Sequence, residues 1–375
     1  ENPETHFTAT GEVGTDTAAF TADGRFAGKN VDDTLVDTDK AIYTLSITNG
    51  DYALDGATAA TPYAMTKTVK GKGRINPYTL QLAADDVTKT YDATSALPNA
   101  AGTYLKDPNR PTEGDAVTIT ADGVFGGPNA GRYANNVHYT NLAIDPATNP
   151  YGNYVLGAAQ AAGGVTGNGT ITPRILSIVA HEVGKVYDGT RKLLNGSTDL
   201  TDSDDNLLAP SAQFDVTNLQ ESDTLAGLGL SATGKYKDKN VSTADVNGPG
   251  VTYHVKLTNG NYALAQGADG NFSQETDVDG KGRITPRTIA VQADTAKKVY
   301  DTTTALSNAA SHLSAVHGAG SVNTILADDT VNVKSATGTF QSKDVAGTPG
   351  TNLVDYTGIA LDNPNYALAS DRLDN

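Results

Sequence analysis

A strand-like phrase with a proline in its middle recurs along the sequence. It reads "GKGRITPRTIAV" at residues 280–291, "GKGRINPYTLQL" at 71–82 and "GNGTITPRILSI" at 167–178. Proline has no backbone N–H and cannot donate to a sheet ladder, so it belongs at the starts, edges or bulges of strands. The apolar residues on its two sides are five positions apart, so one straight strand would point them to opposite faces. We therefore predict that each proline joins two strands of two successive domains without a flexible linker.

Three further motifs occur in a fixed order between the prolines. A Lys-x-Tyr-Asp phrase comes first, a Gly-x-aromatic phrase second, and an Asn-Tyr-x-Leu phrase last. Together they define a repeat of about 100 residues, which indicates a tandem array. Because both ends of the chain interrupt a repeat, we expect it to be a piece of a longer array. The predicted domains are residues 1–76, which lack the first strands, the complete repeats 77–172 and 173–285, and residues 286–375, which lack the closing strand.

The recurrent residues are predicted to have structural roles. We expect the tyrosines to pack in the core with the hydroxyl reaching a polar partner. The aspartate of Lys-x-Tyr-Asp is followed by Ala, Gly or Thr, whereas a left-handed position would require Gly each time, so we expect the aspartate to cap a turn. No acid or base recurs beside it, and no catalytic residue is predicted. The motif residues are Pro77, Pro173, Pro286, Tyr91, Asp92, Tyr187, Asp188, Tyr300, Asp301, Tyr52, Tyr154, Tyr262 and Tyr366.

Alternation of apolar and polar residues predicts half-buried antiparallel strands at 41–47, 251–257 and 355–361. Residues 307–317 are compatible with a short helix or turn. Short strands and a repeat of this size predict an all-β fold of tandem Ig-like β-sandwich repeats. Because such repeats contact only their neighbours, we expect an elongated rod. A β-grasp-like repeat with one short helix is the alternative.

The chain is strongly acidic and has no cysteine. Its net charge of −16 and its isoelectric point near 4.6 argue against nucleic acid and anionic membranes, which need a basic footprint. The lack of cysteine excludes disulfides, thiolate catalysis and Cys-ligated zinc. No apolar run approaches the roughly 20 residues of a transmembrane helix. The first residues, "ENPETHFTAT", do not resemble a signal peptide.

No cofactor is predicted, and calcium is the one metal that the sequence suggests. The acidic clusters "DSDDN" (202–206) and "DVDG" (277–280) have an oxygen-rich spacing that suits calcium. Neither cluster continues into a full calcium-loop signature, and neither recurs in every repeat, which favours solvated acidic loops. The six histidines lie at unrelated places in the repeat without metal-ligand spacing.

A covalent crosslink is a further alternative. Each Lys-x-Tyr-Asp lysine has an asparagine late in the same repeat, and Lys–Asn isopeptide bonds staple some cysteine-free surface β-domains. Such a bond needs a buried acid near the pair, and none is evident at a fixed position. An intact mass lower by one ammonia per bond would reveal it. The pairs are Lys89 with Asn153, Lys185 with Asn261, and Lys298 with Asn365.

The motif order "ITPR…KVYDGT…ATGKY…KNV…GNYAL…GKGRITPR" resembles the YDG and MBG-type repeats of large bacterial surface adhesins. These are filamentous-haemagglutinin-like exoproteins, often exported by two-partner secretion. The resemblance covers essentially the whole chain and is strongest at 173–301. The sequence departs from the family pattern in three places. At 122–130 "GPNA" replaces the Lys-Asn-Val phrase, and residues 143–153 carry an insertion. The glycine of Tyr-Asp-Gly is present only as Gly189. Such variation suits structural repeats better than a shared catalytic site.

The resemblance implies an extracellular stalk or adhesive region, on the bacterial cell surface or secreted, that serves cell adhesion or biofilm contact. Its partners would be neighbouring repeats of the same chain and a host-surface or matrix glycan or protein, with no nucleic acid and no membrane insertion. A carbohydrate- or ligand-binding β-module is the alternative, and the absence of tryptophan counts against it. An enzyme is not expected, because it would need a unique acid–base constellation.

Overall fold

The computed structural model of the chain is nearly all β, which confirms the predicted all-β fold. It divides into two compact units, Glu1–Thr172 and Pro173–Asn375. The helical elements of the described residues are the short helix α1 (Ala158–Gly163) and the 3₁₀ turns η1 (Pro3–His6), η3 (Ala101–Tyr104), η4 (Leu225–Leu228) and η6 (Ala309–His312). The structure describes residues 3–31, 40–55, 65–97, 101–110, 115–195, 198–199, 213–241, 249–318, 324–348 and 350–373.

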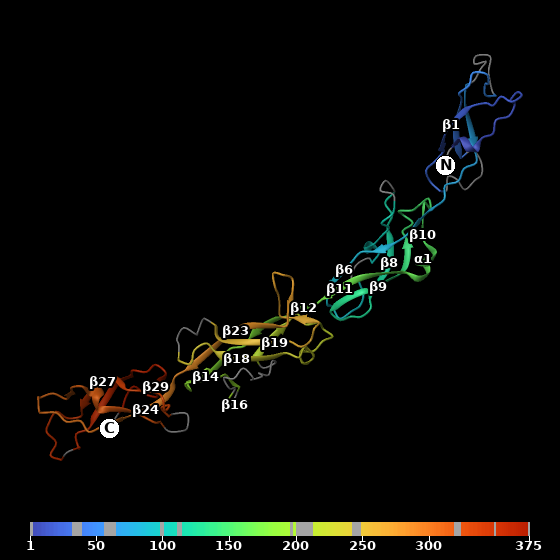
Figure 1. Ribbon diagram of the computed structural model, residues 1–375. Helices are drawn as coiled ribbons and strands as arrows, with labels where there is room; N and C mark the ends of the chain where they lie inside the picture. Colours follow the sequence, from blue (N-terminus) through green and yellow to red (C-terminus); the bar gives the residue numbers. More distant parts are fainter. Residues whose placement is uncertain are drawn as a thin grey trace. The chain divides into compact units, whose positions relative to one another are not determined.

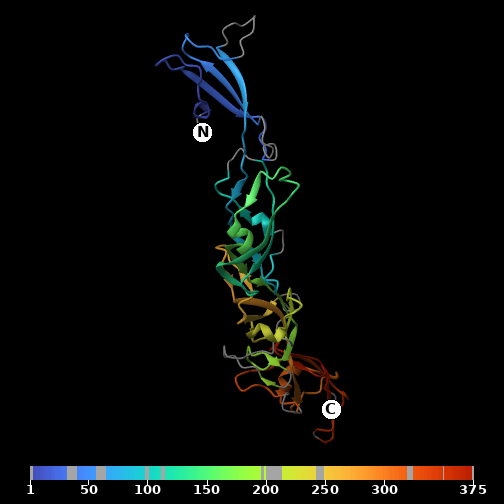
Figure 2. The ribbon, with the colours of Figure 1, turned by 90° about the vertical axis from the view of Figure 1, so that its right-hand side faces the viewer.

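The first part of unit 1 is a three-stranded antiparallel sheet. Its order is β1-β2-β3, with β2 hydrogen-bonded on both sides. Figure 2 shows these strands, coloured in shades of blue, side by side. The strands are β1 (Phe20–Phe26), β2 (Ala41–Ile47) and β3 (Thr66–Gly71).

The rest of unit 1 is built around a four-stranded mixed sheet of order β6-β11-β9-β8. The pairs β11–β9 and β9–β8 are antiparallel, whereas β6 runs parallel to β11. Two short pairs accompany this sheet, β4 parallel to β10 and β5 antiparallel to β7. The strands are β4 (Tyr78–Leu80), β5 (Ala83–Ala84), β6 (Val87–Thr90), β7 (Leu105–Lys106), β8 (Ile119–Phe125), β9 (Gly131–Ile144), β10 (Tyr154–Leu156) and β11 (Val165–Thr172).

Unit 2 begins with the same arrangement. Its four-stranded sheet has the order β14-β23-β19-β18, with β14 parallel to β23 and the other pairs antiparallel. Figure 1 shows β18, β19 and β23 side by side. The short pairs are β12 with β20, β13 with β17, β15 with β16 and β21 with β22. The strands are β12 (Arg174–Ile175), β13 (Ser177–Ala180), β14 (Val183–Val186), β15 (Leu194–Asn195), β16 (Thr198–Asp199), β17 (Phe214–Thr217), β18 (Ser231–Tyr236), β19 (Pro249–Lys256), β20 (Tyr262–Ala263), β21 (Ala265–Gln266), β22 (Phe272–Ser273) and β23 (Glu275–Thr285).

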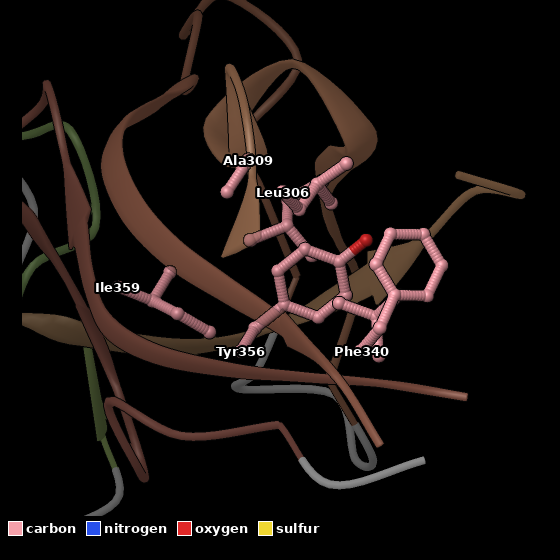
Figure 3. Close-up of a cluster of buried hydrophobic side chains, with 7 residues drawn as sticks. Leu306, Ala309, Phe340, Tyr356 and Ile359 are labelled. Atoms are coloured by element: carbon pink, nitrogen blue, oxygen red, sulfur yellow. The ribbon is translucent and has the colours of Figure 1, made fainter. Parts of the chain in front are cut away.

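The last part of unit 2 has two three-stranded sheets, β26-β24-β29 and β25-β27-β28. Their buried side chains form one cluster, in which Leu306, Phe340 and Tyr356 lie together (Figure 3). A single bridge links Tyr356 to Leu373. The strands are β24 (Arg287–Ala293), β25 (Ala305–Leu306), β26 (Leu313–Val316), β27 (Val333–Phe340), β28 (Val354–Leu361) and β29 (Tyr366–Leu368).

The predicted strands are found in place and are antiparallel to their neighbours, as β2, β19 and β28. The segment 307–317 contains a 3₁₀ turn followed by a strand. The parallel pairs are a feature that the sequence did not predict, and an Ig-like sandwich has only antiparallel sheets. Alternation along one strand reports which face is buried and carries no information on the direction of the partner. The rod arrangement and the sandwich topology stay predictions.

The recurring glycines make room for aromatic rings. In the repeat 173–285, a β-carbon at Gly234 would lie 2.6 Å from one edge of the Tyr253 ring, and one at Gly280 would lie 2.8 Å from the other edge. A β-carbon at Gly282 would lie 2.9 Å from the ring of Tyr236. Only a residue without a β-carbon fits at these three positions, which explains the Gly-x-aromatic and Gly-x-Gly phrases. The corresponding close approaches are Gly24 and Gly71 to Tyr43, Gly73 to Phe26, and Gly169 to Phe125.

Each pivot proline lies where strand pairing changes. Strand β23 ends at Thr285 and β24 begins at Arg287, and the two strands belong to different sheets. Pro286 therefore separates two strands, as predicted. Pro173 lies between β11, which ends at Thr172, and β12, which begins at Arg174. Pro77 directly precedes β4, but β3 ends at Gly71, so residues 72–77 carry no strand pairing and the predicted direct join is not found at this proline. The finer division of the chain into four domains stays a prediction.

Candidate functional site

The lysine of Lys-x-Tyr-Asp forms a buried knot of hydrogen bonds. Lys185 Nζ donates to Asp188 Oδ1 at 2.7 Å, to the Thr190 carbonyl at 2.7 Å and to Thr190 Oγ1 at 3.2 Å. Its side chain is fully buried, and Nζ lies 5.1 Å from the centre of the Tyr236 ring. A buried charge is tolerated only when it is paired and hydrogen-bonded, and this knot supplies both conditions.

The same knot occurs in the other two repeats that carry the motif. Lys89 donates to Asp92 at 2.7 Å and to the carbonyls of Thr94 and Ala96 at 2.7 and 2.9 Å. Lys298 makes the corresponding three bonds, to Asp301 and the carbonyls of Thr303 and Ala305. Because an ammonium has three N–H donors, these bonds occupy all of them. The knot is therefore suited to holding a turn, and its amine is not available as a nucleophile.

The motif aspartates cap turns, as predicted, but the backbone reasoning behind that prediction is wrong. Each carboxylate accepts from the backbone N–H two residues on, at 2.9 Å. The residue between them has a positive φ in every case: 63° at Ala93, 75° at Gly189 and 68° at Thr302. A left-handed Ala or Thr costs about 1–2 kcal/mol. The bonds of the knot offset that cost, which is why glycine is not required.

The hydrogen bonds of the knot also lower the pKa of two of its carboxyl groups. Hydrogen bonds from Lys298 and then from Thr303 lower the pKa of Asp301 to about 2. At Asp92, burial raises the pKa, but hydrogen bonds from Lys89 and Thr94 outweigh it and leave the pKa below its usual value. Both aspartates therefore stay ionised well into the acidic range.

Two of the three motif lysines bond residues other than the asparagines with which a crosslink was considered. The donors of Lys89 and Lys298 are taken up within their own turns, by Asp92 and Asp301 among others. The side chains of Asn153 and Asn365 instead bond residues of the preceding repeat. The arrangement therefore does not favour an isopeptide bond at these two pairs.

The asparagine of Asn-Tyr-x-Leu clasps the Lys-Asn-Val phrase of the preceding repeat. In unit 2, Asn365 Oδ1 accepts from the backbone N–H of Val241 at 2.7 Å, and its Nδ2 donates to Asn240 Oδ1 at 2.9 Å. In unit 1, Asn153 makes the same two bonds, to Val31 N at 2.8 Å and Asn30 Oδ1 at 3.0 Å. These asparagine clasps join residues more than 120 positions apart, from two neighbouring repeats.

An aromatic contact lies beside the clasp of unit 2. The rings of Tyr187 and Tyr366 meet edge to face, with centres 5.6 Å apart. Burial, together with the neighbouring Asp329, raises the pKa of Tyr187 to about 12. Arg287 Nη1 donates to the Tyr187 carbonyl at 3.3 Å, and its Nε donates to the Thr324 carbonyl at 2.6 Å. The first tyrosine of one repeat and the last tyrosine of the next are thus part of one packed junction.

The tyrosines of Asn-Tyr-x-Leu follow the predicted pattern in unit 2. The hydroxyl of Tyr262 donates to Asp223 at 2.6 Å, and that of Tyr366 donates to Asp329 at 2.7 Å. In unit 1, Tyr154 is buried with its ring centre 6.2 Å from that of Tyr78. The remaining motif tyrosines are the half-buried Tyr52, which accepts from Val13 N at 3.2 Å, the buried Tyr91, and Tyr300, which is half exposed.

Within the part of the chain that the structure describes, no group of three or more His, Cys, Asp or Glu is placed to hold a metal ion. The cluster at 202–206 lies outside the described residues. In the other cluster, Asp277 contacts His254 at 2.9 Å and Asp279 contacts Lys237 at 3.0 Å. Among the described residues, no helix has the length and apolar character needed to cross a membrane.

Several residues of these sites were not singled out by sequence reasoning, although a signal was present. The threonine two residues after each motif aspartate recurs in all three knots, as Thr94, Thr190 and Thr303. The clasp partners Asn30 and Asn240 belong to the recurring Lys-Asn-Val phrase. The aspartates that bond the last tyrosines belong to the phrases "ESDTL" at 221–225 and "ADDTV" at 327–331, which resemble each other.

Comparison with known families gives one match. Residues 285–373 match the family model of the YDG domain. The match begins one residue before Pro286 and ends at Leu373, so it contains the third knot, β24 to β29 and the bridge from Leu373 to Tyr356. No curated protein matches the sequence. The chain therefore contains a YDG-type region in its last repeat.

Proposed function

We propose that the chain is a stalk or adhesive repeat region of a bacterial surface adhesin, outside the cell and without enzymatic activity. The observation that carries the proposal is the asparagine clasp, which joins neighbouring repeats by the same two hydrogen bonds in each unit. A chain whose repeated motifs form junctions between repeats is suited to a mechanical role. The YDG-type region at residues 285–373 and the motif order along the rest of the chain support this assignment.

The connection between repeats supports a stiff spacer. Within unit 2, one residue, Pro286, separates β23 from β24. Proline fixes its own φ and restricts the residue before it, so this joint has few conformations. The clasp and the contact of Tyr187 with Tyr366 restrain it further. Repeats that contact only their neighbours then extend in one dimension, and such an array projects whatever it carries away from the cell surface.

Small-angle scattering of the whole chain tests the spacer role. Four repeats of roughly 35 Å in line would give a maximum dimension on the order of 140 Å and a radius of gyration of about 40 Å. A compact chain of this length would have a radius of gyration of about 21 Å. The second result would contradict the proposal. A host-surface or matrix glycan or protein is the expected partner.

A further inference from the structure

In each complete repeat, the strand that carries the knot lysine pairs with the strand that closes the repeat. In the first complete repeat, β6 pairs with residues 169–172 of β11, and Figure 1 shows these two strands beside each other. In the second, β14 pairs with residues 282–285 of β23. Both pairs are parallel and hold four residues of each strand in register. We call each of them the terminal pair of its repeat.

Tension along the chain reaches the two strands of a terminal pair at opposite ends. Load from the preceding repeat comes through Pro77 and reaches β6 at its first residue, Val87. Load to the following repeat leaves β11 at its last residue, Thr172. Because the strands are parallel, Val87 and Thr172 lie at opposite ends of the pair. Tension therefore slides the strands along each other, whereas a load on two residues at the same end would peel them apart.

Sliding is the direction in which a parallel pair resists most. Its hydrogen bonds are evenly spaced along the strands, so all of them share a load that acts along the pair. When the same strands are peeled from one end, each bond carries the whole load in turn. The short pair of β4 with β10, through which the load passes before it reaches β6, is parallel as well.

Two further hydrogen bonds fasten the end of the terminal pair from which the load leaves. The N–H of Tyr91 donates to the Thr172 carbonyl at 2.9 Å, and the Thr172 hydroxyl donates to the Lys89 carbonyl at 3.3 Å. The second complete repeat has both bonds, at 2.9 and 3.2 Å. The threonine before the pivot proline thus ties the closing strand to the strand of the knot.

The terminal pair is also shielded from water. Strand β11 lies inside the sheet, between β6 and β9. Val87, Lys89 and Ile171 are buried. Hydrogen bonds are stronger in such surroundings than in water. The knot of Lys89 holds the turn that follows β6, so this strand is anchored beyond the pair itself.

We propose that the terminal pair is a mechanical clamp that keeps each complete repeat folded while the chain is under tension. The inference rests on the proposed stalk function and deepens it, because it names the part of each repeat that bears the load. A stalk between a surface and an attached partner is loaded along the chain, which is the direction in which the clamp resists. The force at which a repeat unfolds then depends on where the load is applied.

The test compares two points of attachment on β6. The chain has no cysteine, so one introduced cysteine is a unique handle. Thr88→Cys and Thr90→Cys place it on two exposed side chains of the same strand. The whole chain is pulled between this handle and its C-terminal end in optical tweezers. Load at residue 88 slides the strands, whereas load at residue 90, the partner of Thr172, peels β6 away.

We expect the first complete repeat to unfold at about threefold lower force from the Thr90→Cys handle, because one hydrogen bond at a time bears the load in place of about three. The second complete repeat lies between the handle and the chain end in both variants. It is loaded along its own clamp in both, so its unfolding force should stay the same. Urea denaturation should give the two variants equal free energies of unfolding.

A second pair of handles repeats the test in the second complete repeat and decides the question if a threonine variant does not fold. Val186 is 45% exposed and pairs with Thr285, so load on Val186→Cys peels β14 away. The matched control is Gly184→Cys on the same strand, where a β-carbon makes an ordinary contact of 3.6 Å. We again expect about a threefold lower force from the peeling handle.

Equal unfolding forces from the two handles of a strand would overturn the proposal, because the load would then be borne elsewhere in the repeat. A fall in the force of the second complete repeat in Thr90→Cys would overturn it too, since the fall would not depend on the direction of the load. Scattering keeps this result separate from the stalk function. An elongated chain with equal forces would remove the clamp alone, and a compact chain with unequal forces would remove the stalk alone.

Discussion

The repeats 173–285 and 286–373 share their motifs and differ in the strand pairing beside the lysine knot. In the first, β23 runs through the middle of a four-stranded sheet. In the second, Leu373 is the one residue, among those that the structure describes, that pairs at the equivalent place. The knot lysine is fully buried in the first and 18% exposed in the second, and Phe340 and Tyr356 line a groove. The comparison teaches that β23 completes the burial of the knot lysine, whereas the rings of Phe340 and Tyr356 are buried without such a strand.

The largest expected effect comes from removing the knot lysine. Lys185→Met keeps most of the apolar stem but removes three hydrogen bonds and leaves Asp188 without its charged partner. We expect a loss of about 3 kcal/mol in the free energy of unfolding, near the lower limit for breaking a buried pair because Asp188 keeps partial access to water. Urea denaturation followed by circular dichroism measures the loss.

The matched control for the knot is Lys298→Met in the last repeat. Its side chain is already partly exposed, so the loss should be smaller. Hydrogen exchange assigns each loss to its own repeat. Equal losses in the two repeats would show that the closing strand does not contribute to the burial of the knot.

The repeated motifs predicted strands and packing tyrosines because their periodicity reflects burial. Tyr253 and Tyr262 are both fully buried, and each lies in a phrase that recurs. The parallel pairing of β14 with β23 was not predictable, because side-chain alternation does not specify the direction of a partner strand. The left-handed Ala93 and Thr302 were missed because the hydrogen bonds of the knot, which the motif residues alone do not reveal, offset their backbone strain. The asparagine clasp was missed because its two halves lie in different repeats.

A smaller effect is expected from filling the space above Tyr236. In Gly282→Ala the new β-carbon would lie 2.4 Å from Val251 and 2.9 Å from Tyr236, so the sheet must shift. Overpacking of this kind costs about 2 kcal/mol. The control is Gly260→Ala in the same repeat, where a β-carbon meets nothing within 4 Å. Thermal unfolding of the two variants checks the difference, and equal melting temperatures would contradict the role assigned to Gly282.

We expect loss of the asparagine clasp between the two repeats of unit 2 to lower the free energy of unfolding by less than Gly282→Ala does. Asn365→Ala removes the bonds to Val241 and Asn240 and leaves a half-buried backbone N–H without its partner. We expect a loss of about 1–2 kcal/mol. The control is Asn271→Ala, since the side chain of Asn271 bonds only its near neighbour Asp269. If scattering and urea denaturation gave the same result for both variants, the clasp would not hold the repeats together.

The smallest expected effect appears only at high pH and again separates the two repeats. The pKa of Tyr187 is raised to about 12, so folding favours its neutral form. The resulting stabilisation is complete below the ordinary tyrosine pKa of about 10 and is lost as the pH rises from about 10 through 12. Tyr187→Phe should flatten the fall in melting temperature over that range, because no phenol then ionises beside Tyr366. Tyr300→Phe is the matched control, since Tyr300 is half exposed and should leave the profile as it is. If both substitutions changed the alkaline melting profile equally, the contact with Tyr366 would not bury Tyr187.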